Sequence, residues 1–291
     1  MIYEIVHTTR YDYDAAVSAS YGQLHQMPAD LDGQVCLEAT ATIEPRADFL
    51  SERTDYFGNA AAVFTIHEPH SSLTVTSRSL VDCSGRDERF PEAAERVWTS
   101  HLATARPPGD IDAVEFVLDS PRVTRSQALA DYAMVSFAAD TDLASGLLDL
   151  NGRIHRDFEF DADATQTDTP LERVLDLRRG VCQDFAHVMI GCLRSIGLAA
   201  AYVSGYIETD PPAGHPTLVG ADRTHAWVGV HLGSDAWIGI DPTNDQLAGG
   251  RYITTARGRD YGDVVPMRGV VFTEATRSDL TVTVDVRRTL A

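Results

Sequence analysis

The 291-residue chain contains no lysine, so all 24 of its positive charges are arginine. With 43 acidic residues, its formal net charge is −19. A surface this acidic repels phosphate backbones and anionic lipids, and we therefore expect neither a nucleic-acid nor a membrane partner. Without lysine, the chain also has no side-chain amine through which it could be linked to itself.

Two further absences concern targeting. No stretch approaches the roughly 18 apolar residues of a membrane span. Residues 1–5 alternate between apolar and polar instead of placing an apolar run after a basic start, so we expect no signal peptide and a cytoplasmic protein. The cysteines are then expected to be reduced thiols rather than a disulfide scaffold; they are Cys36, Cys83, Cys182 and Cys192.

Alternating patterns dominate the first part of the chain. Residues 35–43 alternate with period two, which is typical of a half-buried strand. Similar patterns occur at 2–11, 61–67 and 73–82. They predict an antiparallel β-rich module over residues 1–85.

Helical patterns follow the module. A helix is expected to start at Pro91, and two more are expected at 126–137 and 140–157. Asp140 or Thr141 is the predicted cap of the last one.

The change of pattern divides the chain. Residues 86–250 hold these helices, a further helix and then strands, and we assign them to one core domain. Residues 251–291 form a C-terminal extension, in which the alternating segment 280–286 is a strand that returns to a sheet.

Segment 181–197 contains the most informative cysteine. Apolar residues recur along it at helical spacing, at Phe185, Met189, Cys192, Leu193 and Ile196. Cys182 is therefore expected in the first turn, where backbone N–H groups and the helix dipole favour a thiolate and can stabilise an oxyanion. A lone cysteine in an apolar helix is more often structural, and Cys192 is interpreted in that way.

Residues 226–232 and 236–240 are predicted to form a hairpin. A register centred on Gly233 pairs Val228 with Ile238 and gathers the apolar residues on one face. On the other face it sets each tryptophan opposite a glycine. A slip of one residue would destroy this agreement.

In the predicted register, His225 lies directly opposite Asp241, close enough for an imidazole–carboxylate hydrogen bond. The alternative is that His225 only ends a strand and Asp241 begins a turn. If the three residues meet, Cys182 attacks a carbonyl carbon and His225 takes the thiol proton and later returns one to the leaving group. Asp241 then fixes the imidazole tautomer.

Three groups of motifs resemble those of the bacterial transglutaminase-like proteins. They are residues 180–187 (GVCQDFAH) with 195–198 (SIGL) and 202–206 (YVSGY), residues 225–227 (HAW), and residues 241–244 (DPTN). The first 85 or so residues, including 55–59 (DYFGN), look like the β-rich N-terminal module of many members. The resemblance implies the α+β fold class, with a papain-like core in which a central helix packs on an antiparallel sheet, and a triad of Cys182, His225 and Asp241.

The resemblance is less specific for the reaction. We expect an amide hydrolase, a cysteine peptidase or amidase, that acts on a peptide, protein or other amide through an acyl-enzyme on Cys182. The alternatives are a protein-glutamine transglutaminase or other amine acyltransferase, and an inactive core used for binding. Candidates for substrate contacts or for support of the triad are Gln183, Asp184, Tyr206 and Trp227.

We expect no metal and no cofactor. Cys182, His187 and Cys192 point in different directions around one helix and cannot share an ion, so His187 is expected to be a packed residue. No phosphate-binding glycine loop occurs. Segment 208–224, rich in Pro, Gly and Asp, is predicted to be a loop that gates substrate or an ordinary connection.

Overall fold

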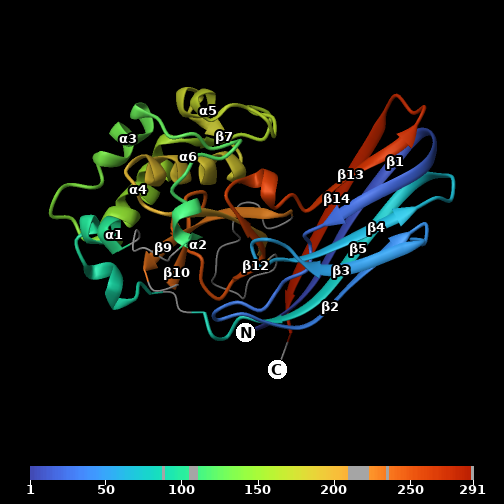
Figure 1. The fold of residues 1–291 in the computed structure, drawn as a ribbon, viewed down its shortest axis with the longest axis horizontal. Coiled ribbons are helices and arrows are strands. Elements are labelled where there is room, and N and C mark those ends of the chain that lie inside the picture. The colour runs from blue at the N-terminus through green and yellow to red at the C-terminus, as the bar shows by residue number, and fades with distance from the viewer. Residues whose placement is uncertain (87–88, 105–110, 209–222, 234–235, 290–291) are drawn as a thin grey trace.

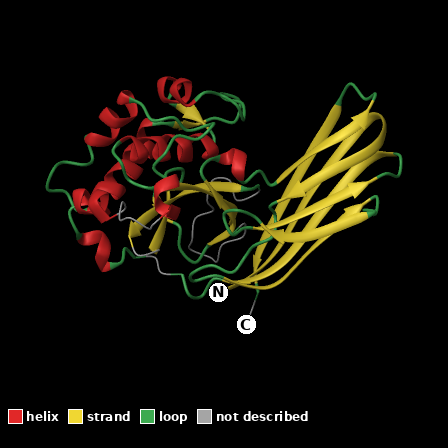
Figure 2. Ribbon diagram, viewed as in Figure 1, coloured by secondary structure: helices red, strands yellow, loops and turns green. Residues whose placement is uncertain are grey.

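The computed structural model describes residues 1–86, 89–104, 111–208, 223–233 and 236–289. Helices gathered around a small sheet form one part of the molecule, and a long twisted sheet that leans away from them forms the other (Figures 1 and 2). The N-terminus lies at the base of the long sheet, where β14, the last strand of the chain, also ends (Figure 1). The predicted α+β class is confirmed. No helix of the described residues has both the length and the apolar character needed to cross a bilayer.

The long sheet is antiparallel and has seven strands. They are β1 (Ile2–Leu24), β2 (Val35–Glu44), β3 (Phe49–Thr54), β4 (Ala60–Ile66), β5 (His70–Asp82), β13 (Met267–Thr273) and β14 (Ser278–Arg288). β1 is long enough to pair with β5 and then β4 along one side, and with β14 and then β13 along the other. The module is therefore built from both ends of the sequence.

Two features of this sheet differ from the sequence prediction. β1 continues past residue 11, where the predicted strand ended. The prediction ended there because a bulge between Asp12 and Val17 interrupts the alternation of apolar and polar residues, which resumes in a new phase. β3 was not predicted, since five of its six side chains are exposed and it lacks an alternating apolar face.

The core sheet is antiparallel and has five strands. Their order is β11 (Gln246–Leu247), β10 (Ala236–Asp241), β9 (His225–Gly233), β8 (Ala200–Ile207) and β12 (Tyr252–Gly258). A short parallel pair, β6 (Glu159–Phe160) and β7 (Arg179–Gly180), lies apart from it. The helical segments are η1 (Glu92–Glu95), α1 (Trp98–Thr104), α2 (Ile111–Glu115), α3 (Gln127–Met134), α4 (Leu143–Asp157), α5 (Leu171–Leu177), α6 (Cys182–Ser195) and η2 (Tyr261–Asp263).

The predicted cap of α4 is wrong. The carboxylate of Asp142 accepts a hydrogen bond from the backbone N–H of Ser145 at 2.8 Å and caps the helix. The backbone of Thr141 is engaged elsewhere, since its carbonyl accepts from Trp98 at 3.0 Å. Three consecutive residues of cap-forming type stand at 140–142, and tertiary contacts select the last of them.

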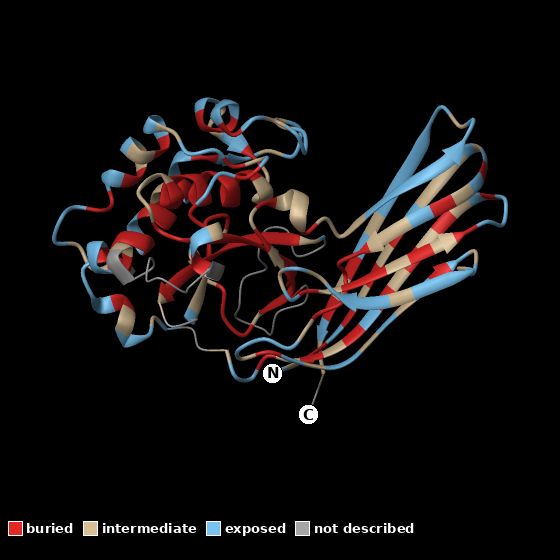
Figure 3. Ribbon diagram, in the orientation of Figure 1, coloured by how far each residue is buried: buried red, intermediate tan, exposed pale blue. Residues whose placement is uncertain are grey.

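α6 is the central helix of the core. Every residue from Asp184 to Arg194 is buried, and the helix packs on β8 and β9 (Figure 3). Arg194 is satisfied inside the core because its guanidinium donates to backbone carbonyls, among them that of Ala200 at 2.8 Å. Gly197, with φ +87°, ends the helix in the left-handed conformation that glycine tolerates best.

Side-chain amides fasten the module to the core. Gln34 donates to the backbone carbonyl of Thr254 and accepts from its N–H, at 2.9 and 2.8 Å. Asn59 bonds to the backbone of Arg257 in the same way, at 2.8 and 2.7 Å. The two amides thus satisfy backbone groups along β12, so the contact between module and core is specific rather than merely apolar.

Candidate active site

The side chain of Asp184 caps the N-terminus of α6. Oδ2 of Asp184 accepts hydrogen bonds from the backbone N–H of Val181 at 2.9 Å and from the hydroxyl of Thr165 at 2.6 Å. Gly180 makes this possible, since a β-carbon at that position would lie 2.4 Å from Oδ2. The cap therefore fixes the turn from which the helix starts.

Cys182 is the first residue of α6, and its side chain is half-buried against the core. Its N–H and that of Gln183 belong to the first turn and have no carbonyl partner within the helix. The next two N–H groups bond to the carbonyl of Val181. The thiol thus lies beside two backbone donors and the positive end of the helix dipole, a position that can stabilise negative charge.

β9 and β10 form the predicted hairpin, but in a register two residues away from the predicted one. Val228 pairs with Ile240 rather than with Ile238. The predicted register folded the chain at Gly233 itself, whereas two residues separate the strand ends, as common hairpin loops require. A shift of two residues keeps each side chain on its predicted face.

His225 and Asp241 meet across this hairpin. They are diagonal neighbours rather than directly opposite, since Ile240 pairs with Val228 and Asp241 is therefore level with Trp227. The carboxylate nevertheless reaches the ring, and Nε2 of His225 lies 2.8 Å from Oδ2 of Asp241. The predicted hydrogen bond is present, although the register that suggested it was wrong.

Further donors surround the Asp241 carboxylate. Oδ2 also accepts from the side-chain amide of Asn244 and the hydroxyl of Tyr252, each at 2.8 Å. Oδ1 accepts from the backbone N–H of Thr243 at 2.8 Å. Burial alone would raise the pKa of Asp241, but His225 and these donors hold it below its usual value. The carboxylate is therefore ionised although it is fully buried.

The two nitrogens of His225 have different surroundings. Burial lowers the pKa of the ring, but the charge and hydrogen bond of Asp241, followed by the Cys182 thiol, raise it to about 10. Nδ1 is buried, and the described residues offer it no hydrogen bond of ordinary geometry. Since Asp241 holds Nε2 and the thiol interacts with the ring, Nδ1 is the nitrogen left to exchange a proton with Cys182.

Trp227 supports the imidazole. Its ring stacks on that of His225 with centroids 6.2 Å apart, and Tyr252 packs edge-on against it at 5.2 Å. Nε1 of Trp227 would lie 3.3 Å from a β-carbon at Gly239, so the indole uses the space that this glycine leaves. Trp227 thereby limits the orientations open to His225.

The other predicted site residues have different positions. Asp184 caps the start of α6, and its described side-chain hydrogen bonds go to Thr165 and Val181 rather than to His225. Gln183 is partly exposed at the same helix end and donates to the carbonyl of Thr167 at 3.0 Å. Tyr206 is buried where the module meets the core, and its hydroxyl bonds to Nδ1 of His7 at 2.8 Å.

His187 is a packed residue, as expected. It is buried, accepts from the N–H of Tyr261 at 3.2 Å and lies against the ring of Tyr202. Burial lowers its pKa to about 3, so the ring is neutral. Among the described residues, no group of three or more His, Cys, Asp or Glu side chains could hold a metal ion.

Sequence reasoning missed Tyr252, which bonds to Asp241, and Gln246, which bonds to Tyr252. Tyr252 donates to Asp241 and accepts from the amide of Gln246 at 2.6 Å. No spacing rule connects Tyr252 with Asp241, because β12 lies on the far side of β8 in the sheet order. Of the predicted gating loop, residues 209–222 lie outside the described residues.

Known proteins resemble this chain over nearly its whole length. A protein of Mycobacterium tuberculosis described only as uncharacterized is 42% identical over 98% of this chain and 92% of its own. A candidate cysteine protease from Cytophaga hutchinsonii, known from its crystal structure, has a TM-score of 0.74 over 99% of this chain and 98% of its own. At 19% identity, that likeness establishes the fold.

A shorter match has a named activity. A protein-glutamine gamma-glutamyltransferase of Pseudomonas aeruginosa is 32% identical over 120 residues, which are 41% of this chain and 18% of that protein. Residues 3–82 match the bacterial transglutaminase-like N-terminal region, and residues 131–242 match the transglutaminase-like superfamily. The second segment includes Cys182, His225 and Asp241. The chain therefore belongs to the transglutaminase-like superfamily.

Proposed function

We propose that this protein is an amide hydrolase that works through an acyl-enzyme on Cys182. One observation carries the proposal: a buried histidine is anchored by Asp241 at Nε2 and has the Cys182 thiol as its neighbour. A nucleophile, a base and an acid that orients the base are the parts that acyl transfer requires. The substrate class is a peptide, protein or other amide.

The first half of the reaction forms a thioester. His225 holds the proton of the thiol at Nδ1, and Sγ of Cys182 attacks the carbonyl carbon of the amide. The N–H groups of Cys182 and Gln183 face the oxygen on which negative charge develops. His225 then returns the proton to the leaving nitrogen, the carbon–nitrogen bond breaks and an amine departs.

The second half releases the acyl group. His225 takes a proton from water, the resulting hydroxide attacks the thioester, and a carboxylic acid leaves as Sγ regains its proton. Cys182 is half-buried rather than enclosed, so water can reach the thioester without a second substrate. Asp241 remains ionised throughout and keeps the ring in one orientation.

A second candidate is amine transfer, in which a primary amine replaces water. The match to a protein-glutamine gamma-glutamyltransferase over 120 residues favours it. The two activities share the acyl-enzyme and differ only in what resolves it. An inactive core that serves only for binding is the third candidate, and the hydrogen-bonded His225–Asp241 pair speaks against it.

Three measurements separate these candidates. A thiol-directed probe should label Cys182, while Cys182→Ala should abolish turnover of any amide found in a peptide-library screen. The buried Cys192 provides the matched control, and Cys192→Ala should keep both labelling and turnover. Retained turnover in Cys182→Ala would refute the proposal. If product formed with an added primary amine exceeds hydrolysis in water alone, the enzyme is a transferase.

A further inference from the structure

β13 is an edge of the long sheet, and it is unusually apolar for an edge. It pairs with β1 and, within the described part of the chain, with no other strand. Val270 is 61% exposed and Phe272 is 56% exposed. Exposed edges are usually protected by charges, and β13 carries none between Arg268 and Glu274. β14, the rest of the same edge, carries charges of both signs.

The backbone of β13 presents hydrogen-bonding groups outward. The carbonyl of Pro266 accepts from the N–H of His25 at 2.9 Å, and that of Phe272 accepts from the hydroxyl of Ser18 at 3.0 Å. Both bonds point to β1. The backbone N–H and C=O groups of even-numbered residues of β13 therefore point toward β1, and those of odd-numbered residues point away from it. The outward N–H and C=O groups are those of Met267, Gly269, Val271 and Thr273.

We propose that β13 is the contact surface for a second copy of this chain, paired antiparallel about a two-fold axis at Val271. In this register Val271 faces its own copy, and Gly269 faces Thr273 of the second copy. The outward groups from Gly269 to Thr273 then all have partners, because these three outward residues are arranged symmetrically about Val271. A shift of the axis to a neighbouring residue would leave some of them unpaired.

The side chains fit the same register. Val270 lies opposite Phe272 of the second copy. The two-fold axis creates this pair twice, so the exposed apolar side chains of both copies become buried. Arg268 lies opposite Glu274 of the second copy, so each end of the contact joins opposite charges. This charge complementarity identifies the occupant as a second copy rather than an unrelated strand.

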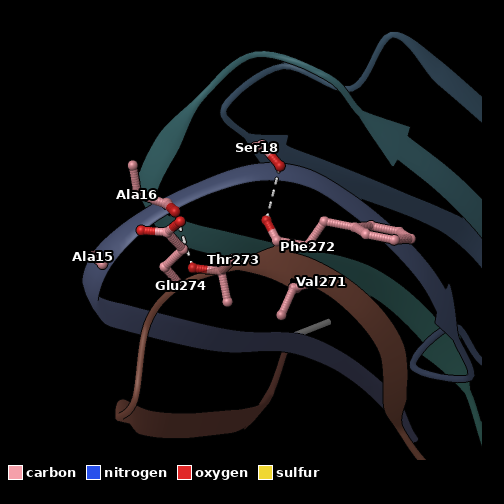
Figure 4. Close-up of a pocket in the computed structure, with 7 residues that line it drawn as sticks. All are labelled: Ala15, Ala16, Ser18, Val271, Phe272, Thr273 and Glu274. Carbon is pink, nitrogen blue, oxygen red and sulfur yellow. Dashed lines mark hydrogen bonds between the residues drawn. The ribbon is translucent and has the colours of Figure 1, made fainter.

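An open hollow of about 590 Å³ flanks the edge, and its lining includes both Val271 and Phe272. Figure 4 shows it between β13 and the segment of β1 around Ala16, and it leaves Val271 accessible. Val271 itself is 37% exposed, so its side chain is open to contact across the edge. The net charge of −19 opposes self-association over long range, and about 0.15 M salt screens this repulsion beyond roughly 8 Å.

Sedimentation velocity of the full chain in about 0.15 M salt tests the proposal. The 31.7 kDa chain should sediment as a dimer. Val271→Pro removes an outward N–H without touching the bonds to β1, and should raise the dissociation constant of the dimer at least about tenfold. Leu280→Pro is the matched control, because Leu280 is an exposed residue of β14 outside the proposed contact.

A charge exchange tests the register itself. Arg268→Glu or Glu274→Arg alone places like charges opposite each other and should weaken the dimer, whereas the double variant should restore it. Far-ultraviolet circular dichroism confirms that each variant is folded. A monomeric wild type, a dimer indifferent to Val271→Pro, or a double variant no better than the single ones would overturn the proposal.

Discussion

The hydroxyl of Tyr252 donates to Oδ2 of Asp241 at 2.8 Å, the same oxygen that holds His225. Because the amide of Gln246 donates to that hydroxyl, its proton is directed to the carboxylate. Tyr252 comes from β12, after the segment that matches the transglutaminase-like superfamily. Tyr252 thus holds the Asp241 carboxylate, which in turn holds the His225 ring.

Replacing Tyr252 by phenylalanine should lower kcat/KM about tenfold and stability by about 1–3 kcal/mol, since two hydrogen bonds are lost, the one to Asp241 and the one from Gln246. With one donor fewer, Asp241 attracts the imidazolium more strongly. The alkaline limb of the pH–rate profile should therefore shift to higher pH, which a purely structural role would not cause.

Tyr132→Phe is the control for this prediction. Tyr132 also donates its hydroxyl to a carboxylate, that of Asp157 at 2.7 Å, but in an exposed position. Steady-state kinetics of this variant should match those of the wild type. An unchanged pH profile in Tyr252→Phe would contradict the positioning role.

The sequence predicted that His225 and Asp241 meet, but it did not predict how the two strands that carry them pair. Both faces of the hairpin were assigned correctly because period-two alternation does not depend on register. The register was wrong by two residues, since composition alone did not show where the turn between the two strands is centred. His225 and Asp241 meet all the same, because a carboxylate can reach a diagonal neighbour.

Contacts made at long range could not be predicted in this way. Tyr252 reaches Asp241 through the order of strands in the sheet, which a single sequence does not specify. Tyr206 stands in a motif next to the site, yet packs toward His7 at the module contact. Neighbouring side chains on a strand point to opposite faces of the sheet, and the sequence alone does not show which face the module covers.

Replacing Asp241 by asparagine should lower turnover about 10²- to 10⁴-fold, because an amide no longer stabilises the imidazolium or fixes its tautomer. It also leaves a buried charge unpaired, which should cost about 3–5 kcal/mol of stability. Chemical denaturation and kinetics measure the two effects. Asp157→Asn, at an exposed carboxylate, is the control and should change neither by much.

Replacing Asp184 by alanine should lower stability by about 1–2 kcal/mol and slow the alkylation of Cys182. The variant leaves the N–H of Val181 unsatisfied and loosens the turn that carries the thiol. Thr165→Val removes only one of the two hydrogen bonds of the cap and should have the smaller effect on both. Alkylation as fast as in the wild type would mean that Asp184 does not position Cys182.

The stability of the fold should depend on pH through His225. The pKa of this ring rises from 6.5 to about 10 on folding, chiefly because Asp241 outweighs the effect of burial. Its stabilising contribution is then complete below pH 6.5 and is lost as the pH rises to about 10. Asp241, whose pKa is lowered, adds stability that is lost as the pH falls through its range.

Thermal denaturation of the wild type and of His225→Gln between pH 6 and pH 10 measures this dependence. The difference in Tm should be largest near pH 6 and should narrow by on the order of 5 °C toward pH 10, because only the wild type loses the imidazolium–carboxylate pair. His67→Gln is the control, since His67 pairs with Asp48 on the exposed surface. A gap that stays constant over this range would show that His225 does not hold its proton through Asp241.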